Sequence, residues 1–287
     1  MDQIQLGIIG GSGFYEMESL TELEEIDIDT PFGKPSDAYI VGTLEGLKVA
    51  FLPRHGRGHR ISPTNLNVKA NIWGFKSLGA EAVVSVSAVG SLKEEIRPLD
   101  VVIPDQFFDR TRLRATSYFD ESGLVAHVGM AEPFCPILSE LVADSATEAG
   151  ASVHRKGTYV CIEGPQFSTA AESHIFRRAG MDVIGMTAVP EVRMAREAEL
   201  HYATFAMSTD YDVWKGEPVS VEMVVANLVK NVEMGKSAVQ ILAKTLSKLG
   251  DKCECGNALE GAIMSDTSTI SLEMKRKFDL LIGKYVS

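Results

Sequence analysis

The 287-residue sequence lacks the features that mark several large classes of protein. It contains no apolar run near the roughly 20 residues that a membrane-spanning helix needs, so we expect no membrane partner. It has no basic excess: 39 acidic residues against 28 basic ones give a net charge of −11, which argues against a nucleic-acid-binding surface. The first residues are polar and acidic rather than typical of a signal peptide, so we expect a cytoplasmic location.

Cysteine is also scarce, with four residues in the chain. Cys253 and Cys255 form one C-x-C pair without a second pair or a neighbouring histidine, whereas a zinc ribbon needs two separated pairs. We therefore expect no metal site and two free thiols in a polar loop, with a structural or redox-labile disulfide as the alternative. His55 and His59 are four residues apart, but the glycines between them predict a loop rather than a metal-binding helix.

What is present is an ordinary globular composition, with 45% hydrophobic and 23% charged residues. Short apolar runs alternate with segments of helical periodicity. Strands are expected at 6–9, 38–43, 47–52, 82–86, 101–103, 159–162, 182–186 and 202–207, and helices at 65–78, 136–149, 170–178, 190–200, 221–246 and 271–282. This alternation predicts an α/β fold, with a central mixed β-sheet flanked by helices. We expect a single domain over residues 1–287, with a loop at 250–269 and a C-terminal helix within 270–287.

Polar or glycine-rich segments follow five of the predicted strands, where α/β folds place their ligands. They contain Ser12 in a glycine turn, the Arg54-His55 pair, Ser87 among small residues, Thr187, and a carboxylate pair two residues apart. Glycines, hydroxyls and an arginine fork can hold an anion, and paired carboxylates can move a proton. Together these loops indicate an anion cradle beside an acid pair, Asp210 and Asp212. That pattern suits a phosphate nucleophile and a leaving group that needs protonation.

The sequence of these segments resembles the 5′-methylthioadenosine phosphorylases of the purine nucleoside phosphorylase family. The matching stretches occur in family order: GIIGGSG (7–13), DTPFGKPSD (29–37), RHGR (54–57), ANIW (70–73), GSL (90–92), DQ (105–106), DRT (109–111), MAEPFC (130–135), EGP (163–165), FS (167–168), MT (186–187), VPEV (189–192) and TDYD (209–212). The C-x-C pair resembles a feature of some heat-stable members. Two positions depart from the family: Gln166 stands where arginine is usual, and Ser12 where threonine is common.

The resemblance implies the nucleoside phosphorylase fold, a homotrimer or a dimer of trimers, and no metal or organic cofactor. It implies phosphorolysis of methylthioadenosine to adenine and 5-methylthioribose 1-phosphate. Phosphate would bind to Ser12, Arg54, His55, Ser87, Ala88 and Thr187. The nucleoside would contact Phe167, Met186, Thr209, Val221, Val224, Val225 and His59, with His127 reaching in from a neighbouring subunit. Asp210 would face the purine N7, and Asp212 would lie near the 6-amino group.

Bond chemistry agrees with these roles, because breaking the glycosidic bond makes the ribose positive and the purine negative. Asp210 can give the purine a proton only if burial raises its pKa. The alternatives are a phosphorylase for 6-oxopurines, at which an asparagine is usual in place of Asp210, or one of broad purine specificity. A nucleotide-binding oxidoreductase is disfavoured because the glycine turn lacks the complete dinucleotide fingerprint. A nucleoside sensor without turnover is disfavoured by the acid pair.

Overall fold

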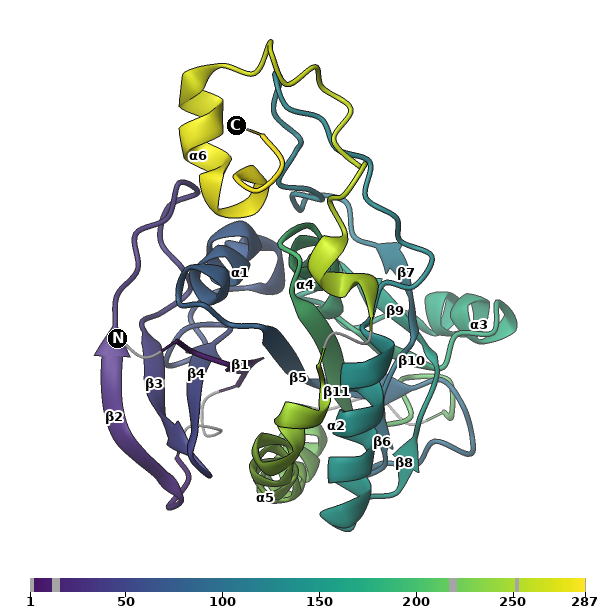
Figure 1. Ribbon diagram of the computed structural model, residues 1–287. Coiled ribbons are helices and arrows are strands. Elements are labelled where there is room, and N and C mark those ends of the chain that lie inside the picture. Colours follow the sequence, from purple (N-terminus) through teal and green to yellow (C-terminus); the bar gives the residue numbers. More distant parts are fainter. Residues whose placement is uncertain (1–2, 12–15, 217–220, 251–252, 287) are drawn as a thin grey trace.

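The computed structural model describes residues 3–11, 16–216, 221–250 and 253–286, apart from the side chains of Val221 and Met223. The strands of these residues join into one mixed sheet (Figure 1). Its main path runs β2 (Leu20–Ile26), β3 (Tyr39–Leu44), β4 (Leu47–Pro53), β1 (Leu6–Gly10), β5 (Ala82–Ser91), β10 (Val183–Gly185), β9 (Thr158–Ile162), β7 (Gln106–Arg110). Beside it, β11 (His201–Asp210) pairs with β5 and with β6 (Val101–Val102), which pairs with β8 (Val153–His154). The predicted mixed sheet with flanking helices is therefore confirmed.

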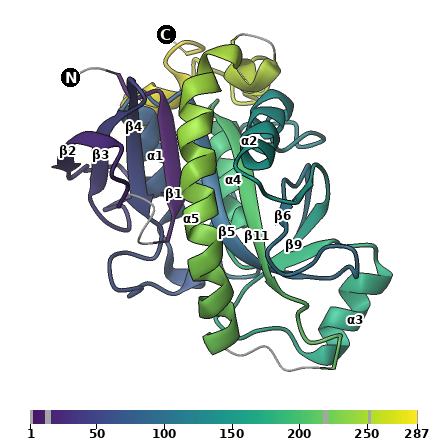
Figure 2. The same cartoon turned by 90° about the horizontal axis from the view of Figure 1, so that it is seen from below.

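Helices cover both faces of the sheet. On one face lie α2 (Pro136–Glu148) and α5 (Val221–Thr245), and on the other lie α1 (Val68–Ser77) and α4 (Ala188–Glu197), with α6 (Leu272–Ile282) packed over α1 (Figures 1 and 2). Successive side chains of a strand point to opposite faces of the sheet: Ile8 packs toward α2 and α5, and Ile9 packs toward α1 and α4. The shorter elements are α3 (Ala170–Arg178) and the 3₁₀ turns at Pro63–Asn65, Leu246–Lys248 and Glu254–Asn257. No helix of the described residues is long and apolar enough to cross a membrane.

Four strands bring their carboxyl ends to the same edge of the sheet. β1 runs parallel to β4 and β5, and β5 runs parallel to β11. The backbone N–H of Arg54, just after β4, donates to the carbonyl of Gly10 at the end of β1 over 2.8 Å. The expected gathering is confirmed for the segments at the ends of these four strands, whereas the fifth segment follows β10, which runs antiparallel to β5.

Two of those segments, however, are strand and not loop. β5 continues through residues 85–91, and β11 continues through Ser208 to Asp210, because the two strands stay paired as far as Asp210 and Gly90. The small side chains of residues 85–91 allow this pairing to continue inside the protein, where the ladder supplies backbone hydrogen bonds. A β-bulge between Ser208 and Asp210 ends the regular register.

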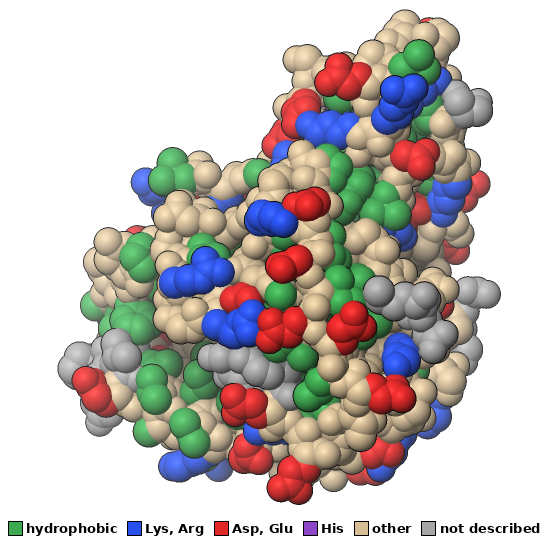
Figure 3. Space-filling view, turned by 90° about the vertical axis from the view of Figure 1, so that its left-hand side faces the viewer, with side chains coloured by type: hydrophobic (Ala, Val, Ile, Leu, Met, Phe, Trp, Pro, Cys, Tyr) green, Lys and Arg blue, Asp and Glu red, His purple; other side chains and the backbone are tan. Residues whose placement is uncertain are grey.

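Strands β2, β7 and β8 were not expected from the sequence. β2 has the composition LTELEEI and exposes most of its side chains, so it lacks the apolar alternation of a half-buried strand. It forms an edge of the sheet, where charged side chains discourage pairing with another chain. Acidic and basic side chains are interspersed over the side of the molecule that carries β2 (Figure 3).

Helix boundaries differ from the expected ones at several places. α1 spans Val68–Ser77 instead of 65–78, because residues 63–65 form a 3₁₀ turn, and α2 and α5 each end one residue early. α4 spans Ala188–Glu197 instead of 190–200, with non-helical backbone at Val189, so its regular part begins at Pro190 as the proline predicts. The C-terminal helix is limited to Leu272–Ile282, with Ser271 as its N-cap.

Gly74 in α1 leaves space that the ring of Tyr39 fills. The Tyr39 hydroxyl donates to the Asn71 carbonyl over 2.6 Å, and a Cβ at Gly74 would collide with that hydroxyl. We expect Gly74→Ala to lower the free energy of unfolding by about 1–3 kcal/mol despite the better helix propensity of alanine, measured by urea denaturation. Gly129→Ala is the control because a Cβ there meets nothing within 4 Å. Equal stability of the two variants would contradict this packing argument.

Glu197 in α4 predicts a pH-dependent stability. Burial raises its pKa from 4.5 to about 7, although the Tyr118 N–H and the Ser117 hydroxyl donate to its carboxylate. The folded state therefore holds this proton more tightly than the unfolded chain, and that stabilisation is lost as pH rises from 4.5 through 7. Glu197→Gln should reduce the loss of stability between pH 6 and pH 8 by about 1.3 kcal/mol, because a pKa of about 7 is crossed within that range. The exposed Glu148→Gln should behave like the parent, and an unchanged slope in Glu197→Gln would refute the assignment.

Candidate active site

A cavity of about 450 Å³ opens at the shared carboxyl edge of β1, β4, β5 and β11. The cavity brings together most of the predicted site residues, which lie between positions 54 and 225 of the chain. Those that line it are Arg54, His55, His59, Ser87, Ala88, Phe167, Met186, Thr187, Thr209, Asp210, Asp212, Val224 and Val225. Ser12 and the side chain of Val221 lie outside the described residues. His127 is exposed and does not line this cavity, while its N–H donates to the Ala262 carbonyl.

Two buried hydroxyl groups in the cavity wall have no hydrogen-bond partner among the described residues. They belong to Ser87 on β5 and to Thr187, which precedes α4. A buried hydroxyl without a partner is costly, so such a pair marks a place where a polar ligand completes the bonding. This end of the cavity suits an oxyanion.

Arg54 lies beneath the same wall and is almost fully buried. Its Nε and Nη2 atoms contact the carboxylate of Glu191, Nη2 also bonds the Ser85 hydroxyl and the Ile9 carbonyl, and Nη1 donates to the Val86 carbonyl. Burial lowers the pKa of Arg54, but the charge and hydrogen bonding of Glu191, together with Tyr202 and Tyr159, outweigh burial and raise the pKa overall.

This bonding corrects one expectation about Arg54. The guanidinium fork is not free to grip an anion with two parallel N–H groups, because Glu191, 137 residues away in sequence, already occupies it. Its Nη1 group donates only to the Val86 carbonyl among the described contacts, which leaves one Nη1 hydrogen for a ligand of the cavity that Arg54 lines.

His55 is neutral at neutral pH. Burial, followed by the charge of Arg54, lowers its pKa to about 4. Its Nδ1–H donates to the Ile61 carbonyl over 2.8 Å, because a carbonyl can only accept, and its ring stacks on His59 with centroids 4.3 Å apart. The ring orientation leaves Nε2 as an acceptor for a protonated ligand oxygen.

The acid pair lies at the end of β11, just after the bulge. Asp210 accepts hydrogen bonds from the Thr209 hydroxyl and the Asp212 N–H, each over 2.7 Å. Burial raises the pKa of Asp210, and the nearby Asp212 charge adds to that, while the two hydrogen bonds partly offset it. Asp210 is therefore the carboxyl group most easily kept protonated here, as the sequence analysis required.

Asp212 is held separately by a residue to which the sequence analysis gave no role. The Ser168 hydroxyl lies 2.8 Å from both carboxylate oxygens of Asp212. Asp212 adopts a positive φ of 48°, a conformation that aspartate tolerates better than most residues. The pair thus consists of one proton carrier and one fixed acceptor.

The far side of the cavity is apolar. Val224, Val225, Leu228 and Val232 of α5 line it together with Met207 of β11. Two asparagines of α5 fasten the helix to the strand end, since Asn227 and Asn231 donate to the carbonyls of Thr209 and Ser208. The predicted valine wall is therefore present for Val224 and Val225.

Arg114 is a buried arginine that links several segments, and no sequence pattern indicated this role. Its guanidinium donates to the carbonyls of Met186 and Val189 over 2.6 and 2.7 Å and to the Glu163 carbonyl over 2.7 Å. The Glu163 carboxylate also forms a salt bridge with Arg114. Burial would raise the pKa of Glu163, but hydrogen bonds from Thr64, from two backbone N–H groups and from Arg114 lower it to about 2. Arg114 thus joins the segments that carry Met186 and Phe167.

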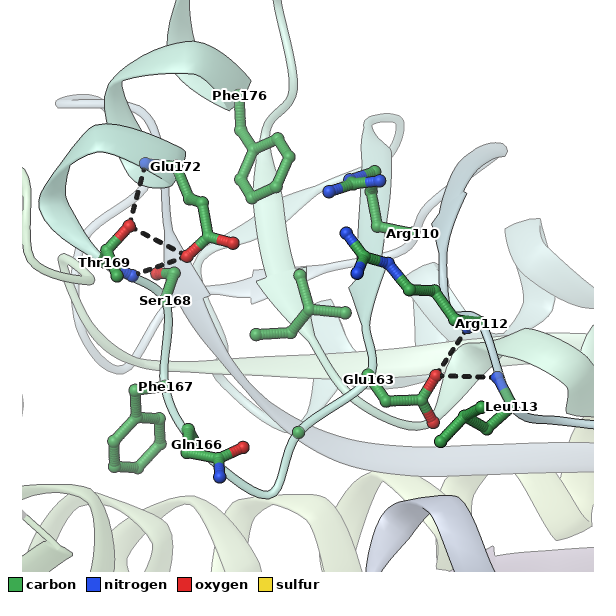
Figure 4. A pocket seen from close by; sticks show the side chains of 12 residues that line it. Arg110, Arg112, Leu113, Glu163, Gln166, Phe167, Ser168, Thr169, Glu172 and Phe176 are labelled. Atoms are coloured by element: carbon green, nitrogen blue, oxygen red, sulfur yellow. Dashed lines mark hydrogen bonds between the residues drawn. The ribbon is translucent and has the colours of Figure 1, made fainter.

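A second cavity of about 560 Å³ adjoins the first and shares Phe167 and Ser168 with it (Figure 4). Gln166, one of the departures from the family pattern, lines it. Arg110 and Arg112 line it too, and so do Glu163 and Glu172, so its lining contains two charged side chains of each sign. The described residues that could together hold a metal, Cys135, His201, Cys253 and Cys255, lie outside both cavities.

Comparison with known proteins places the chain in one family. The sequence profile of the phosphorylase superfamily matches residues 5–244. An S-methyl-5′-thioadenosine phosphorylase of Koribacter versatilis is 52% identical over 285 residues, covering 99% of this chain and 97% of the relative. That of Geobacter sulfurreducens is 49% identical, covering all of both chains.

Solved structures agree. The crystal structure of a methylthioadenosine phosphorylase from an Antarctic soil metagenomic library superposes with a TM-score of 0.94 at 43% identity, covering 98% of this chain and 99% of the other. The Schistosoma mansoni enzyme in complex with tubercidin gives a TM-score of 0.83 at 35% identity, with 90% and 97% covered. The chain therefore belongs to the S-methyl-5′-thioadenosine phosphorylases of the phosphorylase superfamily.

Proposed function

We propose that this chain catalyses phosphorolysis of 5′-methylthioadenosine, releasing adenine and 5-methylthioribose 1-phosphate. One observation carries the proposal: a single cavity holds unpartnered buried hydroxyls at one place and a buried carboxyl with a raised pKa at another. The names of the full-length relatives support the same reaction.

Phosphate occupies the oxyanion end. The hydroxyls of Ser87 and Thr187 donate to its oxygens, with Arg54 behind them. Ser12, His55 and Ala88 complete the predicted contacts. Because Glu191 neutralises Arg54, the hydrogen bonds, rather than a large net positive charge, hold the anion. Phosphate then lies below the ribose, whose developing positive charge it stabilises.

The purine lies toward the acid pair, between Phe167 and Met186. Asp210 gives its proton to N7 as the glycosidic bond breaks, so the departing base does not carry a full negative charge. Thr209 holds Asp210 through its hydroxyl. Asp212 accepts from the 6-amino group, for which its Ser168-fixed carboxylate is suited.

The 5′-methylthio group lies against the apolar wall of Val224 and Val225, with Val221 and His59 as further predicted contacts. An apolar pocket of this kind favours a methylthio group over a hydroxyl by only about 1–3 kcal/mol. Closure by His127 of a neighbouring subunit, in a homotrimer or a dimer of trimers, stays a prediction. Two further points are also predictions: that the reaction needs no cofactor, with phosphate as co-substrate, and that the protein is cytoplasmic.

Chromatographic detection of free base tests the proposed reaction. We expect release of adenine that depends on phosphate and has its highest kcat/KM with methylthioadenosine, compared with adenosine, methylthioinosine and inosine. Faster hypoxanthine release would transfer the assignment to a 6-oxopurine phosphorylase. Base release without phosphate would overturn phosphorolysis.

Asp210→Asn tests the proton donor. Amide nitrogen cannot replace the carboxyl proton, so kcat for methylthioadenosine should fall by about 10²–10⁴-fold while relative preference moves toward 6-oxopurines. Asp144→Asn, which removes only an exposed partner of Arg155, serves as the control and should keep the parent kcat. Unchanged kinetics in Asp210→Asn would remove Asp210 from the donor role.

A further inference from the structure

Four potential metal ligands converge on one point away from the active-site cavity. Cys135 caps the N-terminus of α2, His201 is the first residue of β11, and Cys253 and Cys255 lie at the start of the C-terminal segment. Their ligand atoms all lie within 4.8 Å of one another. The sequence predicts no metal because the C-x-C pair has no histidine near it in the chain, yet folding supplies both a histidine and a third cysteine.

The spacing of these atoms is close to that of a tetrahedral site. The Sγ atoms of Cys135 and Cys253 are 3.6 Å apart, and each lies 3.3 Å from Nδ1 of His201. Zinc bonds of about 2.3 Å to sulfur and about 2.0 Å to nitrogen place neighbouring ligands roughly 3.8 Å apart for sulfur–sulfur and roughly 3.5 Å for sulfur–nitrogen. The four side chains therefore stand where small shifts would complete a coordination shell.

The surroundings favour a cation over a plain cluster of thiols. All four cysteines of the chain are free, and Cys135 and Cys255 are buried. The N–H of Leu138 donates to Sγ of Cys135 over 3.3 Å at the N-terminus of α2, which holds this sulfur in place.

We propose that Cys135, His201, Cys253 and Cys255 bind one divalent transition-metal ion of the zinc class in a closed tetrahedral site. Three soft sulfur ligands with one imidazole select zinc over magnesium or calcium, which prefer oxygen. With four protein ligands no coordination position is left for substrate or water, which is the pattern of a structural site.

Its place in the fold separates this site from the reaction. His201 begins β11 and Asp210 ends it, so the two residues are roughly 30 Å apart along an extended strand. A metal at His201 therefore touches neither the acid pair nor the phosphate hydroxyls. Its role is to hold together chain segments.

The segment held is the one that runs from Cys253 through α6, which Figure 1 shows at the yellow end of the chain. Beyond the cluster, the Leu259 N–H donates to the Glu199 carboxylate, and Lys284 donates to the Gly256 carbonyl. Ile263 pairs with Ala126, next to His127. The metal thus fastens the beginning of a segment whose later part supports the stretch that carries His127.

Metal content and cobalt spectroscopy of the full chain test the site. After purification under reducing conditions, we expect one zinc ion per chain, measured by inductively coupled plasma mass spectrometry. Replacing zinc with cobalt(II) should give the visible bands of a tetrahedral thiolate complex together with a sulfur-to-cobalt charge-transfer band. Reduced protein that takes up no stoichiometric zinc, or that gives an octahedral cobalt spectrum, would overturn the proposal. A Cys253–Cys255 disulfide in protein isolated with thiols protected would overturn it as well.

Variants and metal removal give a second, independent measurement. Cys255→Ser and His201→Asn should lose the zinc, whereas Cys161→Ala, which removes a buried cysteine outside the cluster, should keep one zinc per chain. Stripping zinc from the parent with a strong chelator should lower Tm by roughly 5 °C or more, and zinc but not magnesium should restore it. The chelator experiment needs no variant to fold, and a Tm that does not change on removal of bound zinc would contradict the structural role.

Discussion

The buried ion pair between Arg54 and Glu191 is the interaction on which the active-site edge depends. Through Arg54 it joins the segment after β4 to the Ile9 carbonyl of β1 and the Val86 carbonyl of β5. Through Glu191 it joins α4, and the Tyr202 hydroxyl of β11 donates to the same carboxylate. Removing either charge would leave the other unpaired in the interior, which typically costs about 3–5 kcal/mol. The pair therefore holds the ends of several strands in one arrangement.

The neutralisation of Arg54 by Glu191 explains how an acidic protein can form an anion-binding site. The charge of Arg54 is balanced inside the protein, so the hydroxyls of Ser87 and Thr187 and the remaining Nη1 hydrogen supply the bonding. Asp210, by contrast, has no basic partner in its hydrogen-bond set, and burial makes its proton harder to lose. The same fold thus arranges an anion-accepting wall and a proton donor in one cavity.

Much of this could be predicted from the sequence, for physical reasons that differ between elements. Buried strands such as β1 and helices such as α2, which begins at a proline and is followed by Gly150, carry local signals of composition and punctuation. β2 carries none, because an exposed edge strand is held by pairing with β3 and not by its own apolar pattern. Residues 85–91 look like a loop because small side chains are common in loops, yet pairing with β11 makes them strand.

The sequence by itself determined which chemical groups are available and in what order: hydroxyls, an arginine, a carboxylate pair and a valine-rich helix. Only the tertiary structure decided their partners, because those partners are distant in the chain. Arg54 meets Glu191 across 137 residues, and Cys135 meets Cys253 across 118. Local sequence patterns report on a few neighbouring residues, whereas charge neutralisation and ligand convergence arise when strand order brings remote segments into contact.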